Sequence, residues 1–501
     1  MSKPLVHFGF NYPAAFGLNT QEQNESLDPK WATTLVNWVF DQSGRVAARN
    51  GTRNTNETAI SPIKTIHEYI DANANTLILV ASGNKIYKRV GSDLTDISGT
   101  ITTPTDDHWQ FCNFNGKCVG FQAGHAPIYL SDVSGTFVDS TGTQYNLTSA
   151  IAAGGRLWGV KGSTLYYSDL LINNFAGGSS GIYDLSIYWK NGMDIPVAIT
   201  EFNGQLVVFG RNNIIILSSV FSDATIIENI SGIGCASRDS IQTIGNDIIF
   251  LSTKGVTALS RLIQEKSMPE RDVSKNVRDY LLGFVNSVDG KLVKSSYNKK
   301  QGFYLLSFPN SNKIFHFDIR SILPDGSFRV TEWQATYTAL ESSVDDVLYI
   351  GTQTGYLQTY QDYLDDVLYD GTGGIGYTID YWGVWGDFGQ EVSNNEKMPK
   401  RSSVHIAGGY SNLITLKWRF DFDVTEAYNS SHLVPDGVWY EFGVAEFGEA
   451  EFGTGNSNIQ LKTPMSGNGR VMQFGITSYN TGSEFGLQRI DIQAKLGKLN
   501  G

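Results

Sequence analysis

Cysteine is scarce in this sequence of 501 residues, and long apolar runs are absent. Cys112, Cys118 and Cys235 are too few and too widely spread for a disulfide scaffold, and no C-x-x-C pair indicates a zinc site. We expect them to be reduced thiols in the core. No run reaches about 18 apolar residues, and residues 1–20 lack the basic start and apolar stretch of a signal peptide. The sequence therefore predicts neither a membrane span nor secretion.

Charged residues make up only 18% of the chain, and 38 Lys and Arg residues are outnumbered by 50 Asp and Glu residues. The net charge is −12. A protein that grips nucleic acid needs an excess of basic side chains on one face to neutralise phosphates. This balance argues against tight binding to DNA and leaves weak or repulsive contact with DNA open.

Glycine (53 residues) and aromatic residues (12%) are abundant, a composition typical of β-rich proteins with many turns. One unit is written twice in succession, over residues 199–218 and again over residues 241–260, at an offset of about 42 residues. Each copy has a short run of Ile, Val and Phe between two tight turns, which predicts a β-hairpin.

Further copies of this unit follow one another between residues 61 and 371. Their turns lie about 40 to 55 residues apart, which gives about seven copies. The turn positions are Asn75, Gly116, Gly155, Gly204, Asn246, Gly302 and Asp346. Repetition at this spacing predicts a β-propeller, whose radial sheets leave only short edges. Two stacked β-sandwiches would also give regularly spaced strands, but the repeated turn-strand-turn unit favours a propeller of about seven blades.

Two flanking regions complete the expected architecture, which is mainly β. Residues 1–60 are expected to form an N-terminal arm, and residues 372–501, with their alternating strand patterns, a C-terminal β-sandwich-like domain. Within the propeller, an amphipathic stretch predicts an inserted helix near residues 270–286.

Inside the N-terminal arm, Asp28 followed by Pro29 predicts the start of a helix. Trp31, Leu35 and Trp38 fall at helical spacing after it. A short strand is expected from Arg45 to Arg49. An aromatic pair on a short helix is usually part of a core, and this is the interpretation favoured for Trp31 and Trp38.

Two short motifs fail on their context. Residues 177–181 match the G-x-S-x-G pattern of a nucleophile elbow, but no strand precedes them and no helix follows. Residues 371–376 match the dinucleotide fingerprint, yet a strand pattern follows where a helix N-terminus would be needed. Both are expected to be connectors.

The titratable residues show no pattern of a catalytic or metal site. The histidines are not at metal-ligand spacing, and we expect them in turns or at the surface. They include His67, His108, His125, His316 and His405. A group of carboxylates could supply an acid and a base to a glycosidase, but a solvated acidic loop is favoured. This group is Asp345, Asp346, Asp362, Asp365, Asp366 and Asp370. No catalytic residue, cofactor or metal is predicted, and the chain is not expected to be an enzyme.

Dispersed motifs over about the first two thirds of the chain resemble one protein family. Near the N-terminus these are Gly17-Leu-Asn19, Asn37-Trp38 and Arg49-Asn-Gly51, and in the centre residues 202–211, 232–240 and 247–255. Residues 302–309, Phe317-Asp318 and Glu332-Trp333 continue the pattern. The sequence resembles the tail nozzle (tail tubular protein B) and packaged-DNA stabilisation proteins of short-tailed bacteriophages.

The resemblance implies a structural protein of the virion tail, made in the host cytoplasm. It implies a homohexameric ring that retains packaged DNA and conducts it during genome ejection. The implied partners are further copies of the chain, the tail adaptor that residues 1–60 would contact, and a tail fibre or a needle or plug protein. Double-stranded DNA would pass without tight binding, because an acidic or weakly charged wall does not hold the duplex.

Candidate contacts with partners or other subunits are aromatic and basic residues at both ends of the chain. They are Trp31, Trp38, Arg45, Arg49, Phe442, Phe447 and Phe452. The three phenylalanines belong to Glu-Phe-Gly repeats whose period of five fits neither a strand nor a helix, so an exposed loop with glycine hinges is the simplest interpretation. Glu441, Glu446 and Glu451 of the same repeats are candidates for an acidic loop that faces the lumen.

Two other functions remain open at this point. A phage protein that binds host-surface carbohydrate, or a depolymerase, could use a propeller with Tyr166, Trp189 and Tyr381 as stacking platforms for sugars. A cellular propeller enzyme or scaffold is the third alternative, and no residue favours it.

Overall fold

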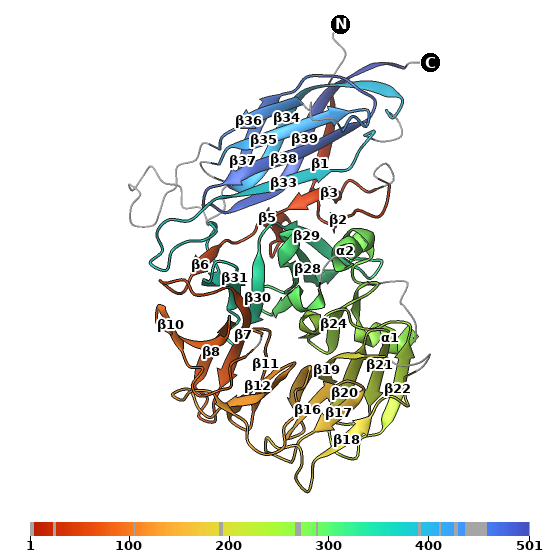
Figure 1. Cartoon of the computed structure of the whole chain (residues 1–501). Helices are drawn as coiled ribbons and strands as arrows, with labels where there is room; N and C mark the ends of the chain where they lie inside the picture. The colour runs from red at the N-terminus through yellow and green to blue at the C-terminus, as the bar shows by residue number, and fades with distance from the viewer. Residues whose placement is uncertain are drawn as a thin grey trace.

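The structure is a computed structural model. It describes residues 5–23, 27–104, 106–189, 194–265, 272–286, 289–388, 392–409, 412–424, 429–435 and 458–499. The described chain is mainly β and forms many small sheets, an arrangement consistent with a β-propeller (Figure 1). The three cysteines are buried and free, which confirms the prediction of reduced core thiols.

Four sheets of four antiparallel strands follow one another from residue 63 to residue 231. The first contains β7 (Ile63–Ile70), β8 (Thr76–Ser82), β9 (Lys85–Val90) and β10 (Asp93–Asp96). The second contains β11 (Gln110–Phe114), β12 (Lys117–Gln122), β13 (His125–Leu130) and β14 (Val138–Asp139). The third contains β15 (Ser149–Ala153), β16 (Arg156–Lys161), β17 (Thr164–Tyr167) and β18 (Gly181–Asp184). The fourth contains β19 (Pro196–Phe202), β20 (Gln205–Gly210), β21 (Asn213–Leu217) and β22 (Ile226–Ser231).

Three further sets of strands continue the series. A three-stranded sheet holds β23 (Gln242–Ile244), β24 (Asp247–Ser252) and β25 (Gly255–Ala258). Next come β26 (Lys294–Asn298), β27 (Phe303–Phe308), β28 (Lys313–Ile322) and β29 (Phe328–Trp333), which belong to a ten-stranded sheet. The last set is β30 (Tyr337–Ser342), β31 (Leu348–Thr352) and β32 (Leu357–Tyr360), joined by the N-terminal strand β6 (Thr52–Asn54).

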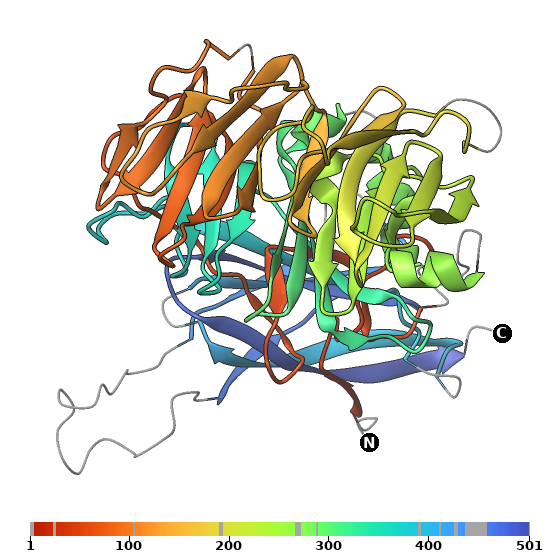
Figure 2. The ribbon, with the colours of Figure 1, turned by 90° about the horizontal axis from the view of Figure 1, so that it is seen from below.

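The first strands of these sets contact one another in a closed cycle. β7 contacts β11, β11 contacts β15, and β15 contacts β19. The short 3-10 helix η1 (Arg238–Ser240), just before β23, contacts both β19 and β26. β26 contacts β30, and β30 returns to β7. The sheets therefore surround a common axis, as Figure 2 shows from below for the strands coloured orange, yellow and green.

Each of the seven turn positions found in the sequence lies between the first two strands of one of these sets. Gly116 and Gly204, for example, have φ angles of +71° and +77°. Such left-handed conformations are open to glycine at no steric cost, and they allow the tight turn of a two-residue hairpin loop. The turn residues therefore mark where each hairpin of the repeat lies.

A β-sandwich stands on the ring at the end where β29 lies (Figure 1). One of its sheets has the order β37-β34-β39-β5-β4, with β1 also paired to β39. The bounds are β37 (Asn458–Pro464), β34 (Asn395–Gly408), β39 (Phe485–Leu499), β5 (Val46–Ala48), β4 (Trp38–Phe40) and β1 (Val6–Asn11). We call this the outer sheet.

The facing sheet continues the ten-stranded sheet from β29 through β3 into β33, β38, β35 and β36, and β2 pairs with β3. Its bounds are β2 (Gly17–Leu18), β3 (Trp31–Val36), β33 (Tyr377–Gly383), β38 (Met472–Asn480), β35 (Ile414–Phe420) and β36 (Asn429–Leu433). One hydrophobic cluster joins residues of both sheets, such as Ile490 and Ile476, to β24 and β28 of the ring.

The prediction that a helix starts at Asp28 is wrong. The chain forms β3 (Trp31–Val36) and β4 (Trp38–Phe40) instead, separated by Asn37 with a φ angle of +61°. Asp28 accepts a hydrogen bond from the Lys30 amide (2.8 Å), so it closes a turn with the same side-chain bond that would cap a helix. Strand pairing of Leu35 with Tyr381 then overrides the helical spacing.

The N-terminal region is not a separate arm in its described part. β1 and β5 pair with β39, β3 lies between β29 and β33, and β6 completes the sheet of β30–β32. Most of these pairings join positions more than 300 residues apart, such as Arg53 and Thr359. The expected strand at residues 45–49 is present as β5.

Helices are few and short in the described chain. They are α1 (Leu259–Glu265), α2 (Arg278–Val285), and the 3-10 helices η1, η2 (Lys275–Val277), η3 (Gly290–Leu292) and η4 (Pro309–Ser311). α2 and η2 fall within the predicted insertion near residues 270–286, whereas α1 was not predicted. Val277 and Leu281 are buried against the ring, so this stretch covers the side of β25.

Candidate functional site

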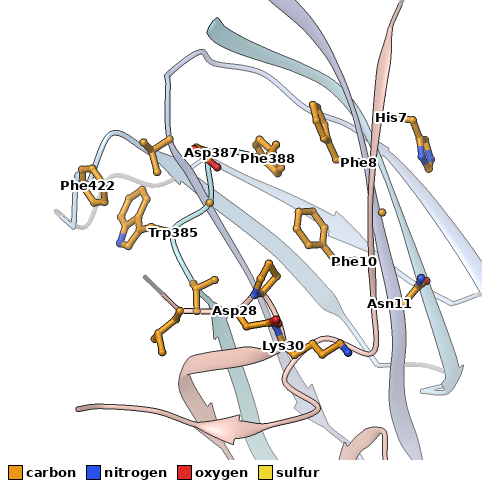
Figure 3. Close-up of a pocket in the computed structure, with 16 residues that line it drawn as sticks. His7, Phe8, Phe10, Asn11, Asp28, Lys30, Trp385, Asp387, Phe388 and Phe422 are labelled. Atoms are coloured by element: carbon orange, nitrogen blue, oxygen red, sulfur yellow. The ribbon is translucent and has the colours of Figure 1, made fainter. Parts of the chain in front are cut away.

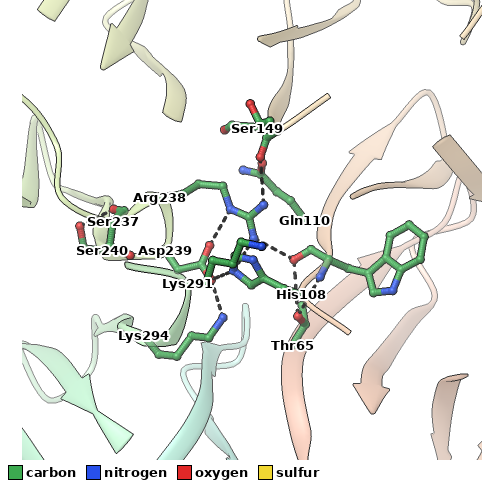
Figure 4. Close-up of polar contacts among 12 residues, drawn as sticks. Thr65, His108, Gln110, Ser149, Ser237, Arg238, Asp239, Ser240, Lys291 and Lys294 are labelled. Carbon is green, nitrogen blue, oxygen red and sulfur yellow. Dashed lines mark hydrogen bonds and ion pairs between the residues drawn. The ribbon is translucent and has the colours of Figure 1, made fainter. Parts of the chain in front are cut away.

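A cluster of charged side chains lies where the inner strands converge (Figure 4). Arg238 and Asp239 come from η1, Lys294 is the first residue of β26, and His108 stands two residues before β11. Because η1 contacts both β19 and β26, the segment that carries Asp239 faces several sheets at once. We call these four residues the axial cluster.

Asp239 is the centre of the axial cluster. One carboxylate oxygen accepts a hydrogen bond from Nε of Arg238 (2.7 Å), and the other lies against Nζ of Lys294 and 2.7 Å from Nε2 of His108. The Arg238 guanidinium also donates to the backbone oxygens of Thr148 and Trp109, both at 3.2 Å. The cluster thus bonds together segments that belong to four different sets of strands.

Burial and charge together set the protonation states of the axial cluster. Burial lowers the pKa of His108 to about 4, although Asp239 acts in the opposite direction. Burial alone would raise the pKa of Asp239, but Arg238, Lys294 and His108 hold it well below its usual value. Burial also lowers the pKa of Lys294, against the effect of Asp239. Asp239 is therefore an anion between two cations at neutral pH.

Three cavities adjoin the axial cluster, and the first, of about 200 Å³, is lined by Arg238, Asp239 and Lys294 among others. One of about 350 Å³ is lined by Lys64, Asp106 and Lys291 among others, and one of about 260 Å³ extends towards Arg211. Some of the charged residues around them pair with each other, as Lys291 does with Asp106 (3.6 Å). Among the described residues no group of His, Cys, Asp and Glu has the arrangement of a metal site. The observed bonds of the cluster link the sheets to one another.

No role is predicted for these residues from the sequence, although Arg238 and Asp239 lie within a motif of the family resemblance. One signal was present in the sequence: Arg238 and Asp239 are adjacent opposite charges in a stretch whose other residues are uncharged and mostly small. Its partners His108 and Lys294 come from distant segments, so no local pattern could connect them.

Three predicted contact residues are buried within the chain, which makes the prediction that they contact partners wrong for this conformation. Trp38 is completely buried, and its indole N–H donates to the backbone oxygen of Asp380 (2.9 Å). Arg49 is also completely buried and is paired with Asp365, while Arg45 is buried beside Asp41. Trp31 is partly exposed and packs edge-on against Phe16 (5.5 Å between ring centroids).

The Glu-Phe-Gly repeats lie outside the described residues. This applies to Glu441, Phe442, Glu446, Phe447, Glu451 and Phe452. Their predicted roles stay predictions.

The candidate sugar-stacking residues, the G-x-S-x-G segment and the acidic group are held mainly by contacts within the chain. Trp189 and Tyr381 are buried, so of the three candidate sugar platforms only Tyr166 is partly exposed, and its ring packs at a tilt against that of Tyr145 (4.2 Å between ring centroids). In the G-x-S-x-G segment, the amide and hydroxyl of Ser179 donate to Asp169. The acidic group is not uniformly solvated, because Asp365 holds the buried Arg49.

Two histidines expected at the surface or in turns are buried: His125 and His316. His316 packs against Trp333 (5.2 Å) and Phe303 (5.0 Å), and burial lowers its pKa to about 3. Aromatic neighbours explain this position, because a neutral imidazole packs as a flat ring.

The buried His316 should make stability depend on pH. Below about pH 6.5 the unfolded chain binds a proton at this residue that the folded chain does not bind. Relative to His316→Gln, the wild-type chain should therefore lose about 1.4 kcal/mol of unfolding free energy per pH unit between pH 6 and 4. Denaturant titrations at several pH values measure this difference, and parallel curves for the two proteins would contradict it.

An exposed apolar surface covers the outer strands of the third and fourth sheets. Ile182 in β18 is 64% exposed, Ile227 in β22 is 52% exposed, and Ile187 between the two sheets is 74% exposed. Other exposed apolar residues of the same region are Leu170, Leu171, Ile172, Tyr188 and Phe221. We call this set the apolar flank.

Contacts between the two sheets make the apolar flank continuous. The Tyr183 hydroxyl donates to the backbone oxygen of Ser222 (2.9 Å), which brings β18 beside the loop that carries Phe221. The side-chain amide of Asn229 donates to the backbone oxygen of Tyr188, which places β22 beside the residues after β18. Large contiguous apolar patches are rare on monomeric soluble proteins and mark interaction sites.

No helix in the described part of the chain has the length and apolar character needed to cross a membrane.

No protein-family model and no curated protein match this chain. Similar solved structures include the extracellular domain of a one component system from B. thetaiotaomicron, with 10% identity and a TM-score of 0.43, covering 79% of this chain and 57% of that one. The Neurospora crassa Pan2 WD40 domain has 10% identity and a TM-score of 0.38, covering 63% and 95%. The computationally designed Ika8 protein has 11% identity and a TM-score of 0.39, covering 63% and 100%. At these scores the fold description rests on the sheet order alone.

Proposed function

We propose that this chain is a subunit of the tail nozzle of a short-tailed bacteriophage, with a propeller of about seven blades and a C-terminal β-sandwich-like domain. Six copies would form a ring that retains packaged DNA and conducts it during genome ejection. The ring would contact the tail adaptor and a tail fibre or a needle or plug protein. The residue motifs in the first two thirds of the chain support the family.

The apolar flank is the observation that carries the proposal. A ring of identical subunits closes through a head-to-tail interface, in which two different surfaces of each copy meet. Such an interface buries apolar area that an isolated subunit leaves in water. Ile182, Ile187 and Ile227 provide a surface of this kind on one side of the propeller. The net charge of −12 supports the role of a conduit, because DNA would slide past acidic subunits without being held.

Mass determination and imaging of the purified protein, alone and with the adaptor, test the proposal. A six-fold ring is expected. A chain that stays monomeric with the adaptor, or a ring that binds duplex DNA tightly with a steep dependence on salt, would contradict it. A trimer that releases oligosaccharide from host polysaccharide would favour the carbohydrate-binding alternative instead.

Replacing Ile182 by Asp should prevent ring formation, because it places an unpaired charge in the centre of an apolar contact. The fold should be unaffected, since the side chain is 64% exposed in the subunit. Sedimentation of the variant measures the loss. Ile322→Asp is the matched control, because Ile322 is 59% exposed but lies at the end of β28, away from the apolar flank.

A further inference from the structure

A groove lined by aromatic rings opens at one edge of the sandwich (Figure 3). Its volume is about 860 Å³. Phe8 of β1 stacks on Phe388 (4.5 Å), and Phe10 packs against Phe474 (4.7 Å). On the far side of the groove Trp385 meets Phe422 (5.0 Å), which is 42% exposed.

One wall of this groove is the open edge of β1. The Tyr12 amide donates to the backbone oxygen of Gln488 (2.9 Å), and this pattern alternates along the antiparallel pair of β1 and β39. The backbone groups of Phe8 and Phe10 therefore face β39, whereas those of His7, Gly9 and Asn11 face away from it. Among the described residues, β1 pairs with β39 alone. Such an edge is a template for one more strand.

The two faces of β1 differ in chemistry. Phe8 and Phe10 point into the groove, while His7 and Asn11 point to the opposite side (Figure 3). On that side the outer sheet presents a basic surface, with Arg489 and Lys495 on the adjacent strand β39, and Arg401 and Lys462 on β34 and β37 beyond it. Its acidic residue Asp491 is already bonded to Arg489 (2.7 Å) and to His405 (3.1 Å). A strand added at this edge should therefore carry an apolar residue towards the groove and an acidic residue next to it, towards the basic surface.

Segment 436–457, outside the described residues, has this pattern in each Glu-Phe-Gly repeat. Adjacent residues of a strand point to opposite faces, so Phe442 would face the groove when Glu441 faces the basic surface. The segment has five acidic residues and no Lys or Arg. Because the period of five is odd, consecutive repeats of one continuous strand would face opposite ways. One groove would therefore take one repeat.

The segment leaves the sandwich at the end opposite to the groove. Leu433, three residues before it, pairs with Ile414 at the start of β35, whereas Phe422 lies two residues after the end of β35. Asn458, just after the segment, pairs with Ala407. Both ends are thus anchored away from the groove, and the chain between them is long enough to extend about 35 Å outward and return. A head-to-tail neighbour would present its groove to this segment.

We propose that the groove beside β1 binds a Glu-Phe-Gly repeat of segment 436–457 from the neighbouring copy, as an added strand with its phenylalanine in the groove. The contact rests on the proposed ring and would link each sandwich to the next. Backbone bonds to β1 would provide affinity, and the aromatic pocket would select phenylalanine.

A labelled synthetic peptide of residues 439–454 tests this contact. The receptor is the full chain with Phe442, Phe447 and Phe452 replaced by Ser, so that its own segment does not compete. The peptide should bind, measured by fluorescence anisotropy, and the same peptide with its three phenylalanines replaced by Ser should bind at least tenfold more weakly. Equal binding of both peptides, or none, would overturn the proposal.

Two pairs of receptor variants locate the binding. His7→Pro removes a backbone N–H that faces away from β39 and should weaken binding at least tenfold, whereas His7→Ala keeps that N–H and should not. Phe422→Asp should weaken binding to a similar degree. Val424→Asp is its control, because Val424 is 68% exposed and does not line the groove. Unchanged binding by His7→Pro and Phe422→Asp would place the peptide elsewhere and overturn the proposal.

Ring assembly by the receptor chain, compared with the wild-type chain, distinguishes failure of this inference from failure of the proposed function. If the chain with the three Ser replacements forms rings as well as the wild type does, the repeat does not link the copies and the inference fails, while the nozzle proposal stands. If the wild-type chain forms no ring with the adaptor, the nozzle proposal fails. Binding of the peptide to the groove would then still support the groove as a site for the repeat.

Discussion

Replacing Arg49 by Met should lower the free energy of unfolding by about 3 to 5 kcal/mol. Arg49 is completely buried, and its guanidinium donates two hydrogen bonds to Asp365, at 2.8 and 2.6 Å. It also donates to Asn37 (3.1 Å) and lies over the ring of Tyr377 (4.1 Å). The side chain thus holds the N-terminal strands, the loop after β32 and the sandwich together, and its loss leaves Asp365 without its cation.

Denaturant unfolding followed by tryptophan fluorescence measures this effect. The matched control is Arg53→Met, because Arg53 pairs with Asp362 (2.8 Å) at a site where both side chains are more than a third exposed. Exposed pairs contribute about 1 kcal/mol or less. The double variant Arg49→Met, Asp365→Asn should recover part of the loss, since no unpaired carboxylate remains. Similar losses for Arg49→Met and Arg53→Met would show that burial of the pair is not the cause.

The hairpins could be predicted because their signals are local. The turn at Gly204 and the apolar run at residues 205–210 lie next to each other in the chain, and β20 forms there. The same local logic failed at Asp28, where one side-chain bond serves a turn as well as a helix start. What decided between them was the pairing of β3 with β33, about 350 residues away, which no window of sequence contains.

The charged residues were the hardest to place. Arginine is usually exposed, and nothing near Arg45 or Arg49 in the sequence marks either residue as buried. Their acidic partners, Asp41 and Asp365, become evident only in the fold, and one of them lies more than 300 positions away. The axial cluster could not be predicted for the same reason. No local pattern in the sequence marks its residues, and they come together only when four segments meet in the fold.

Replacing Asp239 by Asn should destabilise the ring of sheets by about 3 to 5 kcal/mol, because Arg238 and Lys294 would remain buried without an anion between them. Their side chains are only 10% and 8% exposed, so water replaces the carboxylate only in part. Asp106→Asn is the control, since Asp106 pairs with Lys291 at 3.6 Å in a more exposed position. Denaturant unfolding at pH 7 compares the two, and a loss under about 1 kcal/mol for Asp239→Asn would contradict the central role of this carboxylate.

The advantage of the wild-type chain over Asp239→Asn should also depend on pH with a definite sign. The pKa of Asp239 is held well below its usual value in the folded chain, mainly by Arg238 and Lys294 against the effect of burial. The stability it contributes is therefore present above the unfolded pKa of about 3.9 and is lost as the pH falls through the folded pKa. The difference in unfolding free energy should be constant from pH 5 to 7 and should shrink below about pH 4. A difference that grows on acidification would mean that the carboxylate is protonated more easily in the folded chain, and that burial outweighs the cations around it.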